Sequence, residues 1–310
     1  MAGIIIYSDT TTLTLELLTA ARTIAEATGL TITAVSINNP DQAAELSTRG
    51  ADVYAIDSTG LILADTAAVA SALEQAAGQS EANIILLASN RRGKELAGRL
   101  AQVWDAGCLS DVKAITCKKG MVLCERNVLG GAAVATQHIT VDKQVIAISP
   151  RSFPVSTDQG EGKVIEFEVD IKPSLRIVET RKKAEDNVKI EEAEILLVVG
   201  QGIENIENLP VVNEIAKALG GEVACSKPVA SDKKWFGEER IVGLSGKICK
   251  PQLAIILGVS GQVQFTVGIR DSHTIVSINN DEKAFMNQMA DYVLIADLKE
   301  AVPELKKKII

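Results

Sequence analysis

The residues of this sequence that could do chemistry lie where apolar strands end. The apolar run Leu253–Leu257 leads directly into the turn Gly258–Gln262, which opens a helical pattern, and a second run, Thr274–Ile278, ends at Asn279. A helix that starts in a glycine-rich turn presents free backbone N–H groups and a positive dipole end, which suits a phosphate. Neighbouring parallel strands that end together form a ligand crevice. Neither turn fits the phosphate-loop or dinucleotide fingerprints, so these residues predict a nucleotide-shaped site without naming its ligand.

The composition narrows the function classes. Of 310 residues, 46% are apolar but only 3% are aromatic, and the formal net charge is −8. This balance is typical of α/β layers, and it argues against a nucleic-acid partner, which would require basic patches interleaved with aromatics. No apolar run approaches about 20 residues and the start of the chain lacks a basic region, so no membrane insertion is expected. Five cysteines without a Cys-x-x-Cys pair argue against a disulfide framework or a metal site and favour the cytoplasm.

The elements that would carry such a site alternate between strand and helix patterns. The segment Thr12–Thr28 has apolar residues at helical spacing and ends at Gly29, where a left-handed cap is expected. The other predicted elements of this half are strands at Ile4–Tyr7, Leu30–Ile37, Val53–Ile56 and Ile84–Ala88, and helices at Asp41–Thr48, Ala64–Ala77 and Gly93–Trp104. This alternation predicts a mostly parallel sheet with helices on both faces.

The pattern changes between Val112 and Phe167. Short strand candidates separated by turns predict antiparallel strands at Val112–Cys117, Val122–Arg126, Ala132–Thr136 and Val145–Ser149. The charged stretch Glu179–Asn187 then lacks apolar periodicity and predicts a solvated linker.

After this stretch the strand–helix rhythm restarts. The predicted elements are strands at Ile195–Val199, Glu222–Cys225, Leu253–Leu257, Thr274–Ile278 and Tyr292–Ile295, with a helix at Pro210–Leu219. We therefore expect an α/β protein with two domains. Residues 1–187 would form an α/β layer with an antiparallel extension, and residues 188–310 a doubly wound parallel-sheet domain.

Several segments, in their order and spacing, resemble the alpha subunit of electron transfer flavoprotein. In the last third of the chain they are Val242–Ile248, Gly258–Phe265, Arg270–Asp281, Ala290–Leu298 and Val302–Leu305. The combination is specific, although each piece alone would be weak. In the first half, Ser89–Leu100, Leu109–Val112 and Asn127–Val134 resemble the same family less specifically.

The resemblance implies that the C-terminal domain binds FAD. Near the adenosine half of FAD, the resemblance places three residues, Asn279, Asp297 and Leu298. Along the cofactor, it places the consecutive residues Ser260, Gly261, Gln262, Val263, Gln264 and Phe265. It brings to the isoalloxazine ring Ser226, Lys227, Val242, Gly243, Leu244 and Ser245. A hydroxyl such as that of Ser245 can donate to a ring nitrogen and shift the redox potential.

Four positions depart from the pattern of the family. Gln201 and Lys227 stand where the family usually carries arginines, Leu244 where it carries Gln, and Phe265 where it carries His. These changes lower the density of cations and hydrogen-bond donors around the ring. Lys227 keeps a positive charge there but cannot stack as a planar group. We therefore expect FAD to bind with potentials that differ from those of the family.

Plainer interpretations exist for several of these residues. Ser260 and Asp297 each precede a helical pattern and could simply cap a helix. The two histidines, His138 and His273, are interpreted as structural or exposed, and Cys225 and Cys249 as small buried hydrophobic residues. No arrangement of a nucleophile with a base, and no pair of carboxylates, indicates a catalytic site. The sequence thus predicts a cofactor crevice without substrate-activating residues.

An electron carrier needs such a crevice. As implied by the resemblance, this chain would be the alpha subunit of a heterodimer whose N-terminal domain docks the beta subunit and holds no cofactor of its own. Its FAD would take electrons from a dehydrogenase and pass them to another redox protein or a quinone reductase, whose identities stay open. One alternative is an enzyme with an NAD- or ATP-type site on the C-terminal sheet. Another is a nucleotide-sensing scaffold whose site is vestigial.

Overall fold

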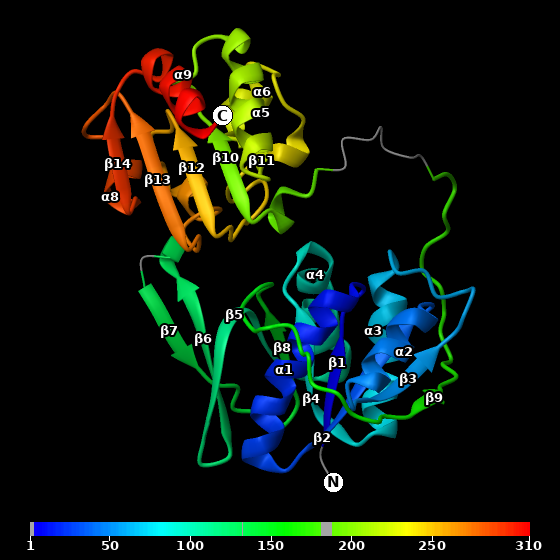
Figure 1. The fold of residues 1–310 in the computed structure, drawn as a ribbon. Coiled ribbons are helices and arrows are strands. Elements are labelled where there is room, and N and C mark those ends of the chain that lie inside the picture. Colours follow the sequence, from blue (N-terminus) through cyan, green and yellow to red (C-terminus); the bar gives the residue numbers. More distant parts are fainter. Residues whose placement is uncertain (1–2, 132, 181–187) are drawn as a thin grey trace. The chain divides into compact units, whose positions relative to one another are not determined.

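In the computed structural model, residues 3–131, 133–180 and 188–310 are described, and the chain divides into two units, Met1–Arg181 and Lys182–Ile310. The predicted linker Glu179–Asn187 falls largely on residues 181–187, which lie outside the described residues. Each unit has its own sheet (Figure 1), and each packs its own buried hydrophobic clusters.

The first unit is built on one nine-stranded sheet with the order β7-β6-β5-β8-β4-β1-β2-β3-β9. Its strands are β1 (Gly3–Tyr7), β2 (Thr31–Ile37), β3 (Asp52–Ile56), β4 (Ala82–Ala88), β5 (Gly107–Lys118), β6 (Met121–Val128), β7 (Ala133–Gln137), β8 (Gln144–Ile148) and β9 (Val164–Glu166). Its helices are α1 (Thr11–Thr28), α2 (Pro40–Thr48), α3 (Thr66–Gln79) and α4 (Arg91–Trp104). The expected parallel sheet is confirmed, and Gly29 ends α1 in the left-handed conformation with a φ of 74°.

The antiparallel extension is only partly as expected. β5, β6 and β7 do form an antiparallel ladder. The prediction that Val145–Ser149 belongs to it is wrong, because β8 lies between β4 and β5 and pairs in parallel with both. Four of its five residues are buried, as in a central parallel strand that is covered on both faces.

Helix α3 also differs from its predicted extent. The sequence pattern predicts an end at Ala77, directly before Gly78, but the helix continues to Gln79 and Ser80 is its C-cap. The left-handed conformation falls on Glu81 instead, with a φ of 52°. A glycine can end a helix but need not do so. The glycine after Ala77 therefore led to a predicted helix end two residues before the observed one.

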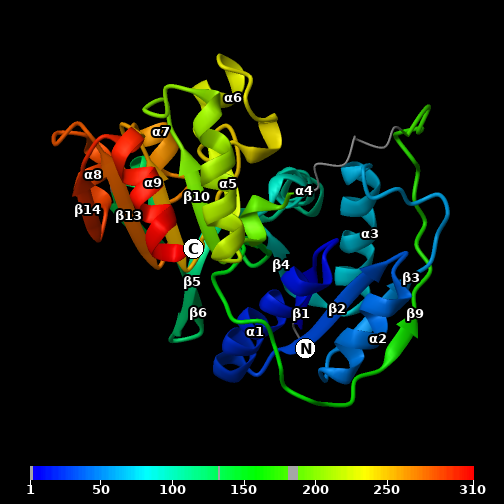
Figure 2. The same ribbon diagram turned by 45° about the horizontal axis from the view of Figure 1, so that its top comes forward.

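The second unit holds a five-stranded parallel sheet with the order β11-β10-β12-β13-β14. Its strands are β10 (Ile195–Val199), β11 (Glu222–Cys225), β12 (Leu253–Leu257), β13 (Thr274–Asn279) and β14 (Tyr292–Ile295). Its helices are α5 (Leu209–Ala218), α6 (Lys227–Ser231), α7 (Val263–Thr266), α8 (Phe285–Met289) and α9 (Leu298–Ile309). Figure 2 shows α5 and α9 together on one face and α7 and α8 on the other. The doubly wound α/β fold class is confirmed.

The two sheets share one topological feature. In the second unit the chain order reverses between β10 and β12, and in the first unit between β1 and β4. The connections leave in opposite directions at such a point, and in α/β folds ligands commonly bind at the carboxyl ends of the two strands there. In the described part of the chain, no helix is long and apolar enough to cross a membrane.

Candidate cofactor site

Two backbone turns meet at the reversal point of the second sheet. The turn after β10, Gly200–Ile203, contacts the turn that begins at Gly258 after β12. The N–H of Gly202 in the first turn donates to the carbonyl oxygen of Gly258 in the second, at 3.0 Å. A Cβ on Gly258 would lie 2.7 Å from the Cα of Gly202, and the φ of Gly258 is +64°. The glycines therefore allow the two turns to touch backbone to backbone at the reversal point.

The turn after β12 presents a row of unused donors. The six consecutive N–H groups from Val259 to Gln264 donate to no acceptor among the described residues. The hydroxyl of Ser260 also lacks a hydrogen-bond partner there, and its residue is exposed. Successive free N–H groups at a strand-to-helix turn form a binding site for anions, and a pyrophosphate could accept several of these hydrogen bonds. This donor set fits a dinucleotide such as FAD.

Asn279 connects the ends of β13 and β12. Its Nδ2 donates to the carbonyl oxygen of Val259 at 2.9 Å, and its Oδ1 accepts from the N–H of Asp281 at 3.0 Å. The side chain is 5% exposed. The structure thus gives Asn279 a role in holding the donor-bearing turn in place.

A second tight turn packs against α7. It spans Val242–Lys247, and within it the N–H of Leu244 donates to the carbonyl oxygen of Gln264 at 2.7 Å. The structure therefore brings together two segments that the sequence analysis assigned to the cofactor. Leu244 is 69% exposed and Ser245 is exposed, whereas Phe265 is 7% exposed and packs into the core below.

The ends of β10 and β11 contribute three more predicted residues. Ser226 is 7% exposed, and its backbone N–H donates to the carbonyl oxygen of Val199 at 2.9 Å, while its hydroxyl has no partner among the described residues. Lys227 and Gln201 are both exposed. The ammonium group of Lys227 forms no ion pair within the described ranges. A buried hydroxyl without a partner is available to a ligand.

The last two predicted residues follow β14. Asp297 caps α9, since its Oδ1 accepts from the N–H of Lys299 at 2.8 Å, so the capping interpretation of Asp297 is confirmed. Leu298 is 8% exposed and lies beside Gly258, because a Cβ on that glycine would be 2.8 Å from Leu298 Cδ1. By contrast, Ser260 caps no helix, because the N-cap of α7 is Gln262.

Two cysteines lie close in sequence to predicted site residues. Cys225 and Cys249 are fully buried, as expected for small hydrophobic residues. Burial raises the pKa of the Cys225 thiol to about 12, with Arg240 opposing and Glu239 adding to the rise. Among the described residues, no cluster of His, Cys, Asp or Glu could hold a metal ion.

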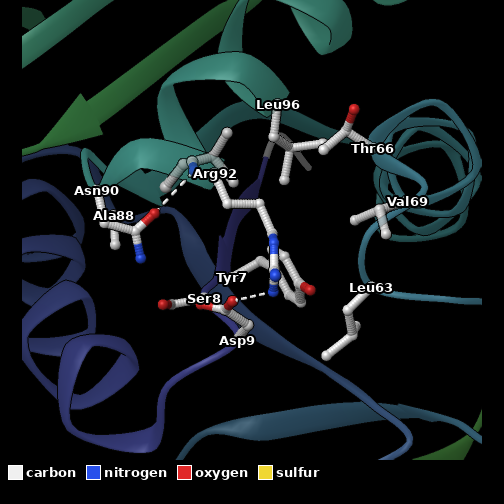
Figure 3. Close-up of a pocket in the computed structure, with 12 residues that line it drawn as sticks. Tyr7, Ser8, Asp9, Leu63, Thr66, Val69, Ala88, Asn90, Arg92 and Leu96 are labelled. Carbon is white, nitrogen blue, oxygen red and sulfur yellow. Dashed lines mark hydrogen bonds and ion pairs between the residues drawn. The ribbon is translucent and has the colours of Figure 1, made fainter. Parts of the chain in front are cut away.

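The first unit has a pocket at its own reversal point, which the sequence analysis missed (Figure 3). It lies beyond β1 and β4, and the Arg92–Asp9 ion pair, 2.5 Å long, spans it. The free volume is about 10 Å³, which is room for one water molecule. Burial raises the pKa of Tyr7, whose hydroxyl has no partner in the described part of the chain; Asp9 adds to this rise and Arg92 opposes it.

Comparisons with known proteins agree with this arrangement. Residues 9–172 match the family model described as "Electron transfer flavoprotein domain", and residues 189–270 match "Electron transfer flavoprotein FAD-binding domain". Protein FixB of Escherichia coli O127:H6 (strain E2348/69 / EPEC) is 35% identical over 228 residues, which cover 72% of each chain. Protein FixB of Escherichia coli O157:H7 is 31% identical over 308 residues, which cover 97% of this chain and 96% of that protein. The chain therefore belongs to the electron transfer flavoprotein family, as one of its alpha subunits.

Proposed function

We propose that this chain binds FAD in its second unit and carries electrons between a dehydrogenase and another redox protein or a quinone reductase. The observation that carries the proposal is the run of six N–H groups from Val259 to Gln264, at the reversal point of the sheet, that donate to no acceptor among the described residues. Such a run suits the pyrophosphate of FAD. The bound flavin would supply the redox chemistry.

The residues of the chain would bind and orient the cofactor. Ser226 and Ser245 bring hydroxyls without described partners to the same crevice, and Lys227 adds a positive charge that favours an anionic flavin. Asn279 would act mainly through the turn that it holds. Asp297 and Leu298 would border the adenosine half, with Asp297 also capping α9.

The first unit, with the linker to residue 187, would dock the beta subunit of the heterodimer. Family members work as electron carriers with such a partner. The cytoplasmic location and the assignment as a carrier rather than an enzyme stay predictions. An electron carrier requires no catalytic residue of its own, and none is proposed.

Identification of the flavin tests this function. The chain is co-purified with its beta subunit, the cofactor is released by heat, and the supernatant is analysed by chromatography and mass spectrometry. Release of one FAD per heterodimer is the expected result. A colourless complex, or one that releases NAD or ATP, would refute the proposal in favour of a nucleotide-binding enzyme or scaffold.

A further inference from the structure

A lysine outside the predicted site residues contacts the turn after β10, at the reversal point of the sheet. The ammonium group of Lys233 donates to the carbonyl oxygen of Ile203 at 2.9 Å and to that of Gln201 at 3.4 Å. It also lies 4.2 Å from the centroid of the Trp235 ring. The two hydrogen bonds join residues 32 and 30 positions apart and hold the ammonium group against the turn after β10.

The backbone around Lys233 is fixed as well. Its N–H donates to the carbonyl oxygen of Pro228 at 3.2 Å, directly after α6, and the N–H of Trp235 donates to Val229 at 3.2 Å. The turn that it grips is the one whose Gly202 contacts Gly258. Lys233 is therefore anchored at both ends, one turn away from the row of unused donors.

The charge of Lys233 lacks an acidic partner. The side chain is half-buried, and it forms no ion pair with a carboxylate in the described part of the chain. Carbonyl oxygens and an aromatic face solvate an ammonium group without cancelling its charge. A half-buried cation held in this way raises the electrostatic potential of the crevice and favours an anionic ligand.

We propose that Lys233 is a positioning residue for the anionic cofactor: it holds the turn Gly200–Ile203 in place and supplies a positive charge that attracts the FAD pyrophosphate. The proposal rests on the proposed function, since it needs FAD as the ligand. Under this proposal, Lys233 supplies a positive charge beside Gln201, whose own side chain carries no charge.

The test compares three variants of the complete heterodimer after its flavin has been removed. Lys233→Met keeps the apolar stem over Trp235 but removes the charge. Lys233→Arg keeps both the charge and the donors. Lys234→Met is the matched control, because it removes the same charge one residue away, where the exposed side chain forms no hydrogen bond or ion pair with the described residues. FAD is titrated by fluorescence quenching at about 0.05 M and about 0.5 M salt, which changes the range of electrostatic screening.

We expect Lys233→Met to weaken FAD binding about tenfold at low salt, equivalent to about 1.4 kcal/mol. The loss should shrink at high salt, because screening weakens the wild-type attraction as well. Lys233→Arg and Lys234→Met should stay within about twofold of wild type. A loss in Lys233→Met that does not depend on salt would overturn the proposal in favour of a purely structural role.

Two further outcomes separate this proposal from the proposed function. If the wild-type complex binds FAD and Lys233→Met binds it equally well, only the role of Lys233 is refuted. If the wild-type complex binds no FAD under any condition, the proposed function fails and the role of Lys233 fails with it.

Discussion

Asn279 holds the turn after the neighbouring strand through one hydrogen bond, from its Nδ2 to the carbonyl oxygen of Val259, 2.9 Å long. Its Oδ1 is engaged by the N–H of Asp281. Both ends of the amide are thus used within the protein. Since Val259 begins the run of N–H groups that have no acceptor among the described residues, this bond sets the orientation of the turn that we propose for anion binding.

Asn279→Ala should therefore weaken FAD binding indirectly. We expect an affinity loss of about tenfold and a loss of folding stability of about 1–2 kcal/mol, because the carbonyl of Val259 loses its donor. FAD titration and urea denaturation measure the two effects. Asn280→Ala, at the exposed next residue, is the control. An unchanged affinity in Asn279→Ala would show that the turn is held without this bond.

Gly261 is predicted to matter for folding more than for ligand approach. Its φ is +85°, and a Cβ would lie 2.2 Å from the backbone nitrogen of Met286. Gly261→Ala should cost about 2 kcal/mol or more of folding stability, with or without cofactor. A double variant with bulky side chains at residues 260 and 261 would therefore disturb folding. Its loss of FAD could not be attributed to a lost contact between this turn and FAD.

Ser260→Ala provides the cleaner test of that contact. The hydroxyl has no partner among the described residues, so the stability of the cofactor-free protein should change by less than about 0.5 kcal/mol. FAD affinity should fall, because a donor facing the ligand is lost. The two measurements are made on the same preparation. Equal FAD affinity in Ser260→Ala and wild type would place the hydroxyl outside the site.

Lys227 is predicted to tune the flavin potential. Its exposed ammonium group follows β11 and pairs with no acid in the described ranges. Lys227→Ala should lower the potential of the first one-electron reduction by roughly 20–60 mV, since the positive charge favours the anionic flavin. Lys227→Arg should hold or raise that potential, because a guanidinium group can also stack on the ring.

Potentiometric titration decides this prediction. Lys217→Ala serves as the control, because Lys217 lies in the last turn of α5, away from the carboxyl ends of the strands. If Lys227→Ala and Lys217→Ala give the same potential, Lys227 points away from the flavin.

Asp65 is predicted to make the first unit acid-sensitive. Its carboxylate caps α3 and accepts hydrogen bonds from Ala68, Ser174 and Leu175. Burial alone would raise the pKa of Asp65, but these bonds together lower it to about 2. The folded-state pKa lies below the ordinary value of 3.8, so the contribution is complete above that pH and is lost as the pH falls toward 2.

Urea denaturation between pH 2 and 7 measures this contribution. Asp65→Asn should cost about 2 kcal/mol at neutral pH, because the amide presents donors where the carboxylate accepts. It should also flatten the loss of stability below pH 4. Should both proteins show the same pH dependence, other carboxylates dominate the acid response.

The sequence by itself determined the strand–helix rhythm and the turns that follow the strands. Apolar runs such as Leu253–Leu257 and Thr274–Ile278 ended where the strands of the structure end, within one residue. The turn from Gly258 carried its own signal, because glycine and a following helix are local properties of the chain. The same held for the left-handed cap at Gly29.

Only the tertiary structure decided how these elements pair and what each side chain touches. The direction of β8 followed from its insertion between β4 and β5, and a strand pattern contains no information about its neighbours. The contact of Lys233 with Gln201 joins two loops that are 32 residues apart, and no local pattern marks it. Such contacts depend on packing and hydrogen bonding between segments that are distant in the sequence. They are therefore determined by the tertiary structure and not by any local pattern.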